Sequence, residues 1–189
     1  MVPGSNIRAR RTSDNIAAMA ERTATDLIND LELPTIERAL VFAATAHAGQ
    51  VDKAGRPYIF HPVGVAASLL HTDAVSVCVA LLHDVVEDTD VTIGEIEAEF
   101  GSEVAEPVAL LTKPDSKAEP GSRRDDAQYD DYLDGICADP VAARVKLADV
   151  RHNLGRLEHL DDETAERLRR KYEPRVARLE AVVEANPLG

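Results

Sequence analysis

The chain has 189 residues, and 44% of them are hydrophobic, which suffices for one sizeable core but is short for two. The formal net charge of −13 argues against nonspecific binding to nucleic acid or to an anionic membrane, because both require a basic surface. No stretch approaches the roughly 18 apolar residues of a membrane span, and the N-terminus lacks the apolar core of a secretory signal. Cys78 and Cys137 show no paired spacing, so we expect buried thiols in a cytoplasmic protein.

Helical spacing of apolar residues dominates the chain, and strand-like alternation is hard to find. Thr92 and Glu95 form a capping-box signature, and Asp139-Pro140 is a typical helix start. The expected helices cover residues 13–29, 34–47, 62–71, 74–88, a short segment from 93 to near 101, a following segment to 112, 141–157, and 162–185 as one long helix or two shorter ones. The sequence therefore predicts an all-α bundle of about eight to ten helices.

This bundle forms one predicted domain, residues 13–186, behind a flexible arm of residues 1–12. The segment 49–62 holds glycines, prolines and aromatic rings among charged residues, which favours an ordered loop. The segment 113–124 is polar and rich in Pro, Gly and Ser. It predicts an exposed loop of the kind that often serves as a lid.

The sequence HDVVED ends the apolar helix predicted over residues 74–88. Side chains four apart share a helix face, so a continuous helix places His83 over Glu87 and Asp84 over Asp88. Three carboxylates packed beside an imidazole are unfavourable unless a cation compensates them. The alternative is a helix that simply runs into solvent, with an ordinary histidine near its end.

Two further positions favour the cation. His61 closes the 49–62 loop, where the rigid Pro62 can direct its imidazole inward. Asp149 shares a helix face with Lys146 and Asn153, with His152 beside them. The alternatives here are a histidine in a turn and a surface ion pair between lysine and aspartate.

His61, His83, Asp84 and Asp149 together balance the charge of one divalent cation. This mixed nitrogen and oxygen set suits Mn²⁺, Fe²⁺ or Zn²⁺ and leaves positions open for water and a phosphate oxygen. An open position indicates a catalytic metal, which lowers the pKa of its water and neutralises phosphoryl charge. Glu87 and Asp88 remain to orient or deprotonate that water, which makes them the predicted catalytic pair.

The order of these motifs resembles the hydrolase domain of the RelA/SpoT alarmone family and its stand-alone small alarmone hydrolases. The matching segments lie within residues 36–157, and they are AHAGQ, KAGRPYIFHP, ALLHDVVEDT, FG, LTK, KLAD and HN. The resemblance implies a single-domain, all-helical HD fold and Mn²⁺-dependent removal of the 3′-pyrophosphate from (p)ppGpp, which yields GDP or GTP. It assigns the metal to His61, His83, Asp84 and Asp149, the attacking water to Glu87 and Asp88, and nucleotide contacts to Lys53 and Asn153.

Three positions depart from the family pattern. Relatives usually carry an Arg-Lys pair before the metal histidine, whereas this chain has Asp52 next to Lys53. The basic residue that usually follows the metal aspartate is Val150, with an arginine displaced to Arg151. A small polar residue expected near the base is Arg156. These departures place the question of substrate choice in the nucleotide-recognition residues.

The predicted substrate contacts are Lys53, Lys146, Arg151 and Asn153, with Lys113, Arg123 and Arg124 as further candidates for phosphate. The leading hypothesis is hydrolysis of (p)ppGpp. Two alternatives stay open: hydrolysis of another phosphorylated nucleotide or cofactor, and a non-catalytic nucleotide sensor. The intact Glu87 and Asp88 pair argues against the sensor, and the sequence leaves the oligomeric state open.

Overall fold

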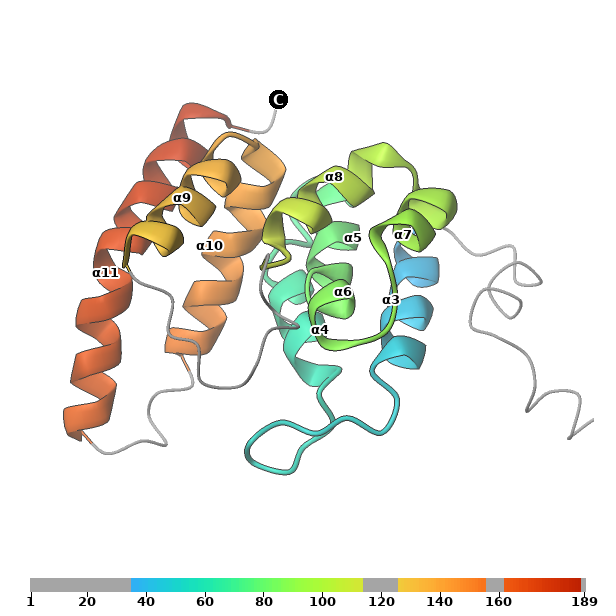
Figure 1. The fold of residues 1–189 in the computed structure, drawn as a ribbon, viewed down its shortest axis with the longest axis horizontal. Coiled ribbons are helices and arrows are strands. Elements are labelled where there is room, and N and C mark those ends of the chain that lie inside the picture. The colour runs from blue at the N-terminus through green and yellow to red at the C-terminus, as the bar shows by residue number, and fades with distance from the viewer. Residues whose placement is uncertain (1–34, 114–125, 156–161, 188–189) are drawn as a thin grey trace, which may run out of the picture.

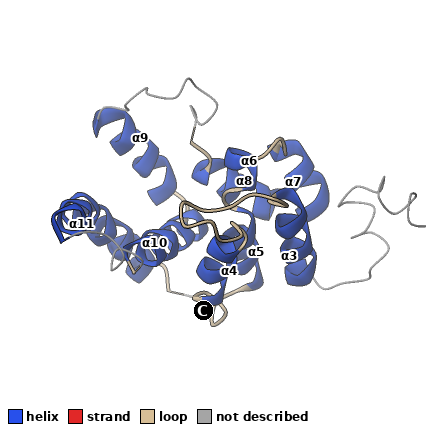
Figure 2. Cartoon of the chain, turned by 90° about the horizontal axis from the view of Figure 1, so that it is seen from below, coloured by secondary structure: helices blue, strands red, loops and turns tan. Residues whose placement is uncertain are grey.

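The structure, a computed structural model, describes residues 35–113, 126–155 and 162–187. The predicted arm, the predicted helix over 13–29 and nearly all of the predicted 113–124 loop lie outside these residues, as do Arg123, Arg124 and Arg156. The described residues contain helices and no strand, with a single isolated bridge between Val51 and Pro57 (Figures 1 and 2). The predicted all-α class is confirmed.

Nine helical segments follow one another along the described chain. They are α3 (Thr35–Ala46), α4 (Phe60–Ala67), α5 (Ala74–Leu82), α6 (Val85–Asp88), α7 (Ile93–Phe100), α8 (Ser102–Leu111), α9 (Asp126–Cys137), α10 (Pro140–Leu154) and α11 (Asp162–Ala185). None of them is both long and apolar enough to cross a membrane. In Figure 1, α9 and α11 lie beside α10 on one side of the bundle, and α3 and α7 lie on the other.

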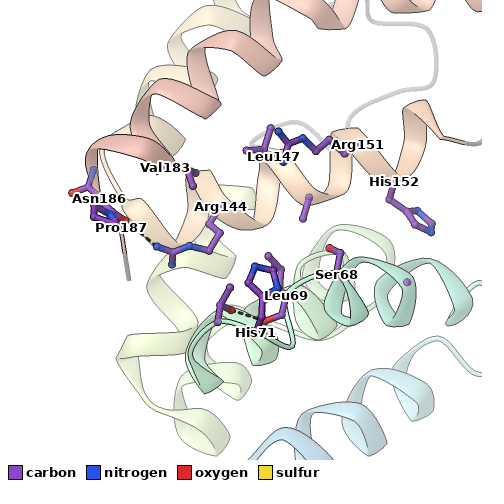
Figure 3. Close-up of a pocket in the computed structure, with 13 residues that line it drawn as sticks. Ser68, Leu69, His71, Arg144, Leu147, Arg151, His152, Val183, Asn186 and Pro187 are labelled. Atoms are coloured by element: carbon purple, nitrogen blue, oxygen red, sulfur yellow. Dashed lines mark hydrogen bonds between the residues drawn. The ribbon is translucent and has the colours of Figure 1, made fainter. Parts of the chain in front are cut away.

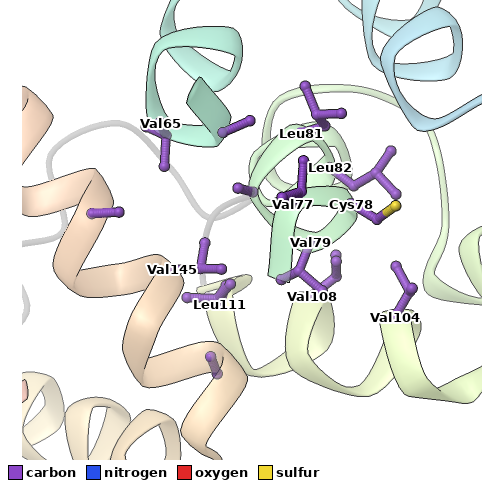
Figure 4. Packing of buried hydrophobic residues seen from close by; sticks show 14 of the residues in the cluster. Val65, Val77, Cys78, Val79, Leu81, Leu82, Val104, Val108, Leu111 and Val145 are labelled. Carbon is purple, nitrogen blue, oxygen red and sulfur yellow. The ribbon is translucent and has the colours of Figure 1, made fainter. Parts of the chain in front are cut away.

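Helix α5 is the centre of the core, as its apolar sequence predicts. Every residue from Ser76 to Leu82 is buried, against α3, α4, α8 and α10. Figure 4 shows Val77, Val79 and Leu82 of α5 near side chains of α4, α8 and α10, among them Val65, Val108 and Val145. A helix that is apolar on every side has no polar face for water, so it is buried at the centre of the core.

Helix α5 is fixed at its start by Asp73. The Asp73 carboxylate accepts hydrogen bonds from the backbone N–H of Ser76 at 2.7 Å and from its hydroxyl at 2.8 Å. The same carboxylate lies 3.5 Å from the guanidinium of Arg144, which is buried in α10. Asp73 therefore caps one core helix and links it to another.

The helix predicted over residues 74–88 is interrupted, so the prediction of one continuous helix was wrong. Helix α5 ends at Leu82, and α6 begins at Val85 after a turn at His83 and Asp84. The His83 ring binds the Ala80 carbonyl through Nδ1 at 2.7 Å, and a continuous helix would use that carbonyl for the Asp84 N–H. The turn brings both side chains to one site.

One other predicted helix has different ends in the structure, and one helix was not predicted. The helix expected over 62–71 covers Phe60–Ala67 instead, which places His61 in its first turn. Pro62 is tolerated there, because backbone N–H groups in the first turn have no acceptor within the helix.

Helix α9 was missed because its sequence is strongly acidic and contains Gly135. Its apolar side chains nevertheless follow helical spacing, with Leu133 and Ile136 buried.

Two helix-start signals are confirmed. Thr92 and Glu95 form the predicted capping box of α7, and Asp139 caps α10 by accepting from the backbone N–H of Ala142 at 2.7 Å. Helix α10 ends at Leu154, three residues short of the prediction, and α11 is one continuous helix. Residues Ala142–Val150 of α10 are all buried, so any polar side chain among them must find its partner inside the protein.

We expect Asp73→Ala to lower the free energy of unfolding by about 1 to 2 kcal/mol, because it removes the cap of α5. Asp73→Asn keeps the oxygen that caps the backbone N–H of Ser76 but loses the charge and the second acceptor oxygen that face Arg144 and the Ser76 hydroxyl, so it should cost less than Asp73→Ala. Urea unfolding of both variants, followed by circular dichroism, measures the difference. Equal losses in the two variants would show that the cap contributes little.

Candidate metal centre and its pocket

Four predicted ligands meet where α4, α10 and the turn between α5 and α6 approach one another. One ligand atom each from His61, His83 and Asp149 lie within 4.8 Å of one another, and all three residues are buried. Asp84 joins them, because its Oδ2 lies 3.3 Å from Nε2 of His61 and 3.2 Å from Nε2 of His83. These residues are separated by up to 88 positions in the sequence, and the fold brings them together.

The His83 ring shows that this site fits a metal ion. Its Nδ1 faces the Ala80 carbonyl at 2.7 Å and must carry the hydrogen there, because a carbonyl only accepts. Its Nε2 is buried without a hydrogen-bond partner among the described residues, and it lies 3.2 Å from Asp84 Oδ2. A cation held by Asp84 and Asp149 beside it would supply the missing partner.

Asp149 is held by two side chains of its own helix. Lys146 Nζ donates to Oδ2 at 2.9 Å, and Asn153 Nδ2 donates to Oδ1 at 2.7 Å, while the same Oδ1 lies 3.3 Å from His61 Nε2. Burial would raise the pKa of Asp149, but Lys146 and His61 hold it well below its usual range. The surface ion pair considered from the sequence is wrong, because Lys146 and Asp149 are only 9% and 6% exposed.

Asp84 has a partner that the sequence did not single out. The Tyr58 hydroxyl donates to Asp84 Oδ2 at 2.6 Å. Burial opposes ionisation of Asp84, yet His83, His61 and Tyr58 keep its pKa below the usual range. Tyr58 lies three residues before His61, so its place in the loop was a usable signal.

The predicted catalytic pair lies on α6 at the mouth of the site. Lys113 pairs with Glu87 through its Nζ, and its backbone N–H is 3.4 Å from Glu87 Oε2. Asp88 is more exposed, and burial together with the nearby charge of Asp84 raises its pKa. A carboxylate with a raised pKa is a better proton acceptor than an ordinary one.

These groups share a pocket with a volume of about 730 Å³, which is in the range of ligand sites. Lys53, Lys146 and Asn153, three of the predicted substrate contacts, line it. Arg151 does not, because two positions along α10 turn its side chain by about 200° from Asp149. It bonds Glu180 of α11 at 2.7 Å and lines a second cavity behind α10, the rear cavity, shown in Figure 3.

Comparison with known proteins agrees with this geometry. A family model described as "HD domain" matches residues 39–179. The chain belongs to the HD domain family. Human guanosine-3′,5′-bis(diphosphate) 3′-pyrophosphohydrolase MESH1 is 42% identical over 129 residues, which is 65% of this chain and 69% of MESH1. Within the family, this HD domain is therefore of the RelA/SpoT type.

Some relatives are much longer than this chain, and a solved structure of similar length also matches. A GTP pyrophosphokinase of Myxococcus xanthus is 38% identical over 145 residues, which is 74% of this chain. This HD domain spans only 19% of that protein. A solved structure described as a metazoan ortholog of SpoT that hydrolyses ppGpp matches with a TM-score of 0.63 and 25% identity, covering 82% of this chain and 94% of the other.

Two of the three departures have a structural explanation in this HD domain. Asp52 organises its own loop: Oδ1 accepts from the backbone N–H groups of Ala54 and Arg56, and Oδ2 pairs with the Arg56 guanidinium. Val150 lines the pocket and is buried, so it contributes apolar surface there. Arg156 lies outside the described residues.

Sequence reasoning missed the pocket wall opposite the 49–62 loop. Tyr129 of α9 and Tyr172 and Arg175 of α11 line the pocket there. The Arg175 guanidinium lies 3.6 Å from the centre of the Tyr129 ring and 5.6 Å from that of Tyr172. The spacing of Tyr172 and Arg175 places them on one face of a helix, but only the packing of α9 against α11 adds Tyr129.

Charge in the pocket depends on the metal. Among the described residues that line it, five are acidic (Asp52, Asp84, Glu87, Asp88 and Asp149) and four are cationic (Lys53, Lys113, Lys146 and Arg175). With the His61 ring, which also lines the pocket and is protonated at pH 7 without a metal, the lining is close to neutral alone and becomes net positive with one divalent cation. A polyanion would find this HD domain attractive only after the metal is bound.

We expect Mn²⁺ binding at pH 7 to release about one proton. Burial would lower the pKa of His61, but bonds to Asp149 and Asp84 raise it to about 9 in the metal-free protein. The ring therefore holds a proton at pH 7 that a metal must displace, and Mn²⁺ affinity should rise as the pH rises toward 9. Titration calorimetry at pH 7 in buffers with different ionisation heats measures the release, and no release would contradict this assignment.

Proposed function

We propose that this HD domain hydrolyses (p)ppGpp, removing the 3′-pyrophosphate to leave GDP or GTP. The single observation that carries the proposal is the buried Nε2 of His83, which has no hydrogen-bond partner among the described residues and lies with His61, Asp84 and Asp149 at a pocket of about 730 Å³. The names of the relatives support this choice of substrate. We propose Mn²⁺ as the metal, and the same ligand set also suits Fe²⁺ or Zn²⁺.

His61, His83, Asp84 and Asp149 would hold the metal, which when bound supplies Lewis acidity and lowers the pKa of water. Asp88 is placed to accept the proton of the attacking water, because its raised pKa favours that role and it is open to the pocket. Glu87, which is paired with Lys113, orients rather than deprotonates. Lys146 and Asn153 fix the Asp149 carboxylate, which makes them positioning groups for the metal ligand.

The remaining groups of the pocket suit a phosphorylated nucleoside. Lys53 is exposed at the rim, where its ammonium can meet phosphate oxygens. Arg175, stacked on Tyr129, offers a cation and an aromatic surface for a base on the opposite wall. Because Asp52 is engaged with its own loop, we propose that base recognition has moved from that loop to α9 and α11.

That relocation favours a second candidate, hydrolysis of a different phosphorylated nucleotide or cofactor by the same metal centre. The proposed catalytic groups are the same, and only the contacts to the base differ. An assay of several phosphorylated nucleotides on the intact chain therefore distinguishes the two candidates.

With Mn²⁺ and ppGpp, we expect release of pyrophosphate and a rate at least about a hundredfold lower in Asp84→Ala, which removes a ligand. Asp130→Ala, an exposed aspartate of α9 outside the pocket lining, is the control and should keep full activity. A panel of phosphorylated nucleotides is assayed in parallel. Intact ppGpp with cleavage of another nucleotide would reject the alarmone substrate, and tight binding without any turnover would indicate a sensor.

We expect Arg175→Ala to raise KM about tenfold with a smaller effect on kcat. The variant loses the proposed cation–π contact between the guanidinium and the base of the nucleotide, which is worth about 1 to 2 kcal/mol of binding. Arg178→Ala is the matched control, because Arg178 lies on the same helix but pairs with Asp134 outside the pocket lining. Steady-state kinetics on whichever nucleotide is cleaved measures both constants. An unchanged KM in Arg175→Ala would show that the base binds elsewhere.

A further inference from the structure

His152 contacts a metal ligand from behind. Its Nδ1 lies 3.1 Å from Nδ1 of His61, with ring centres 5.0 Å apart. Figure 3 shows His152 leaving α10 at one end of the rear cavity. The sequence placed His152 next to the Lys146, Asp149 and Asn153 face without a role. The structure makes it the partner of the ring nitrogen of His61 that points away from the metal centre.

The hydrogen between the two rings can be assigned. Two Nδ1 atoms at this distance share one hydrogen, so one ring donates and the other accepts. A His61 that binds a cation through Nε2 has its hydrogen on Nδ1 and must be the donor. His152 is then the acceptor, with its own hydrogen on Nε2. That nitrogen lies against Gly64 of α4, and the His152 ring lines the rear cavity, which has a volume of about 350 Å³.

Helix α4 makes room for this arrangement. A Cβ atom at Gly64 would lie 2.5 Å from Nε2 of His152, closer than atoms of a side chain tolerate. Gly64 follows His61 by three residues, so the two positions lie on one face of α4. The helix that supplies the ligand thus also leaves the space for the ring behind it.

We propose that His152 is a positioning residue for the metal ligand His61: it accepts the Nδ1 hydrogen and so fixes the tautomer and the orientation of that ring, in space that Gly64 leaves free. Metal-bound histidines commonly donate their other N–H to such an acceptor, and loss of the acceptor weakens metal binding. The inference rests on the metal centre of the proposed function and needs no particular substrate.

The test is Mn²⁺ titration of the metal-free full chain by calorimetry, without nucleotide. His152→Leu fills a similar volume without an acceptor, and we expect its Mn²⁺ affinity to fall about 10- to 100-fold. His152→Asn keeps an acceptor near the Nδ1 position and should stay within about threefold of the unmodified protein. His71→Leu is the matched control, because His71 lines the same cavity without bonding to a ligand, and it should leave the affinity unchanged.

Gly64→Ala gives an independent result, since it displaces the His152 ring without removing a polar group. We expect it to weaken Mn²⁺ binding as His152→Leu does, with circular dichroism showing retained helix content. Unchanged affinity in His152→Leu, or equal losses in His152→Leu and His152→Asn, would overturn the positioning role. If either of these two variants fails to fold, unchanged affinity in Gly64→Ala would overturn it. If the Mn²⁺ affinities follow the expected pattern but the unmodified protein does not cleave ppGpp, only the proposed function is rejected.

Discussion

The buried carboxylate of Asp149 is the constraint on which the rest of the structure depends. A carboxylate inside an apolar helix layer loses its hydration and must recover that free energy from partners. Lys146 and Asn153, one turn away on either side, supply two of these partners, and His61 supplies a third from α4. Because all three converge on the carboxylate, α10 can pass through the core and still present a charged group to the pocket.

The interruption between α5 and α6 performs the corresponding task on the other side of the site. At this turn the side chains of His83 and Asp84 both lie beside His61, and the His83 ring is held by the Ala80 carbonyl. His152 and Tyr58 then support His61 and Asp84 from outside the cluster. Each of the four proposed ligands therefore has a second group that orients it.

The acidic character of the chain and the proposed substrate are reconciled within the pocket. The net charge of −13 repels polyanions at long range, and the pocket lining is close to neutral without a metal. Metal binding would make the lining net positive, so the proposed cofactor would serve binding as well as chemistry. The base end differs from the family pattern, because Asp52 structures its loop while Arg175 and Tyr129 form the opposite wall.

Much of this protein is determined by its sequence through local physical chemistry. Caps and apolar periodicity predicted the all-α class, a helix that starts at residue 74 and the capping box of α7, because these signals act within a few residues. The four proposed ligands were also identified from sequence, through their residue types and motif order. Tertiary packing alone decided the burial of the Lys146 and Asp149 pair and the meeting of Tyr129 with Arg175. These features depend on contacts between distant segments, whose geometry no local pattern contains.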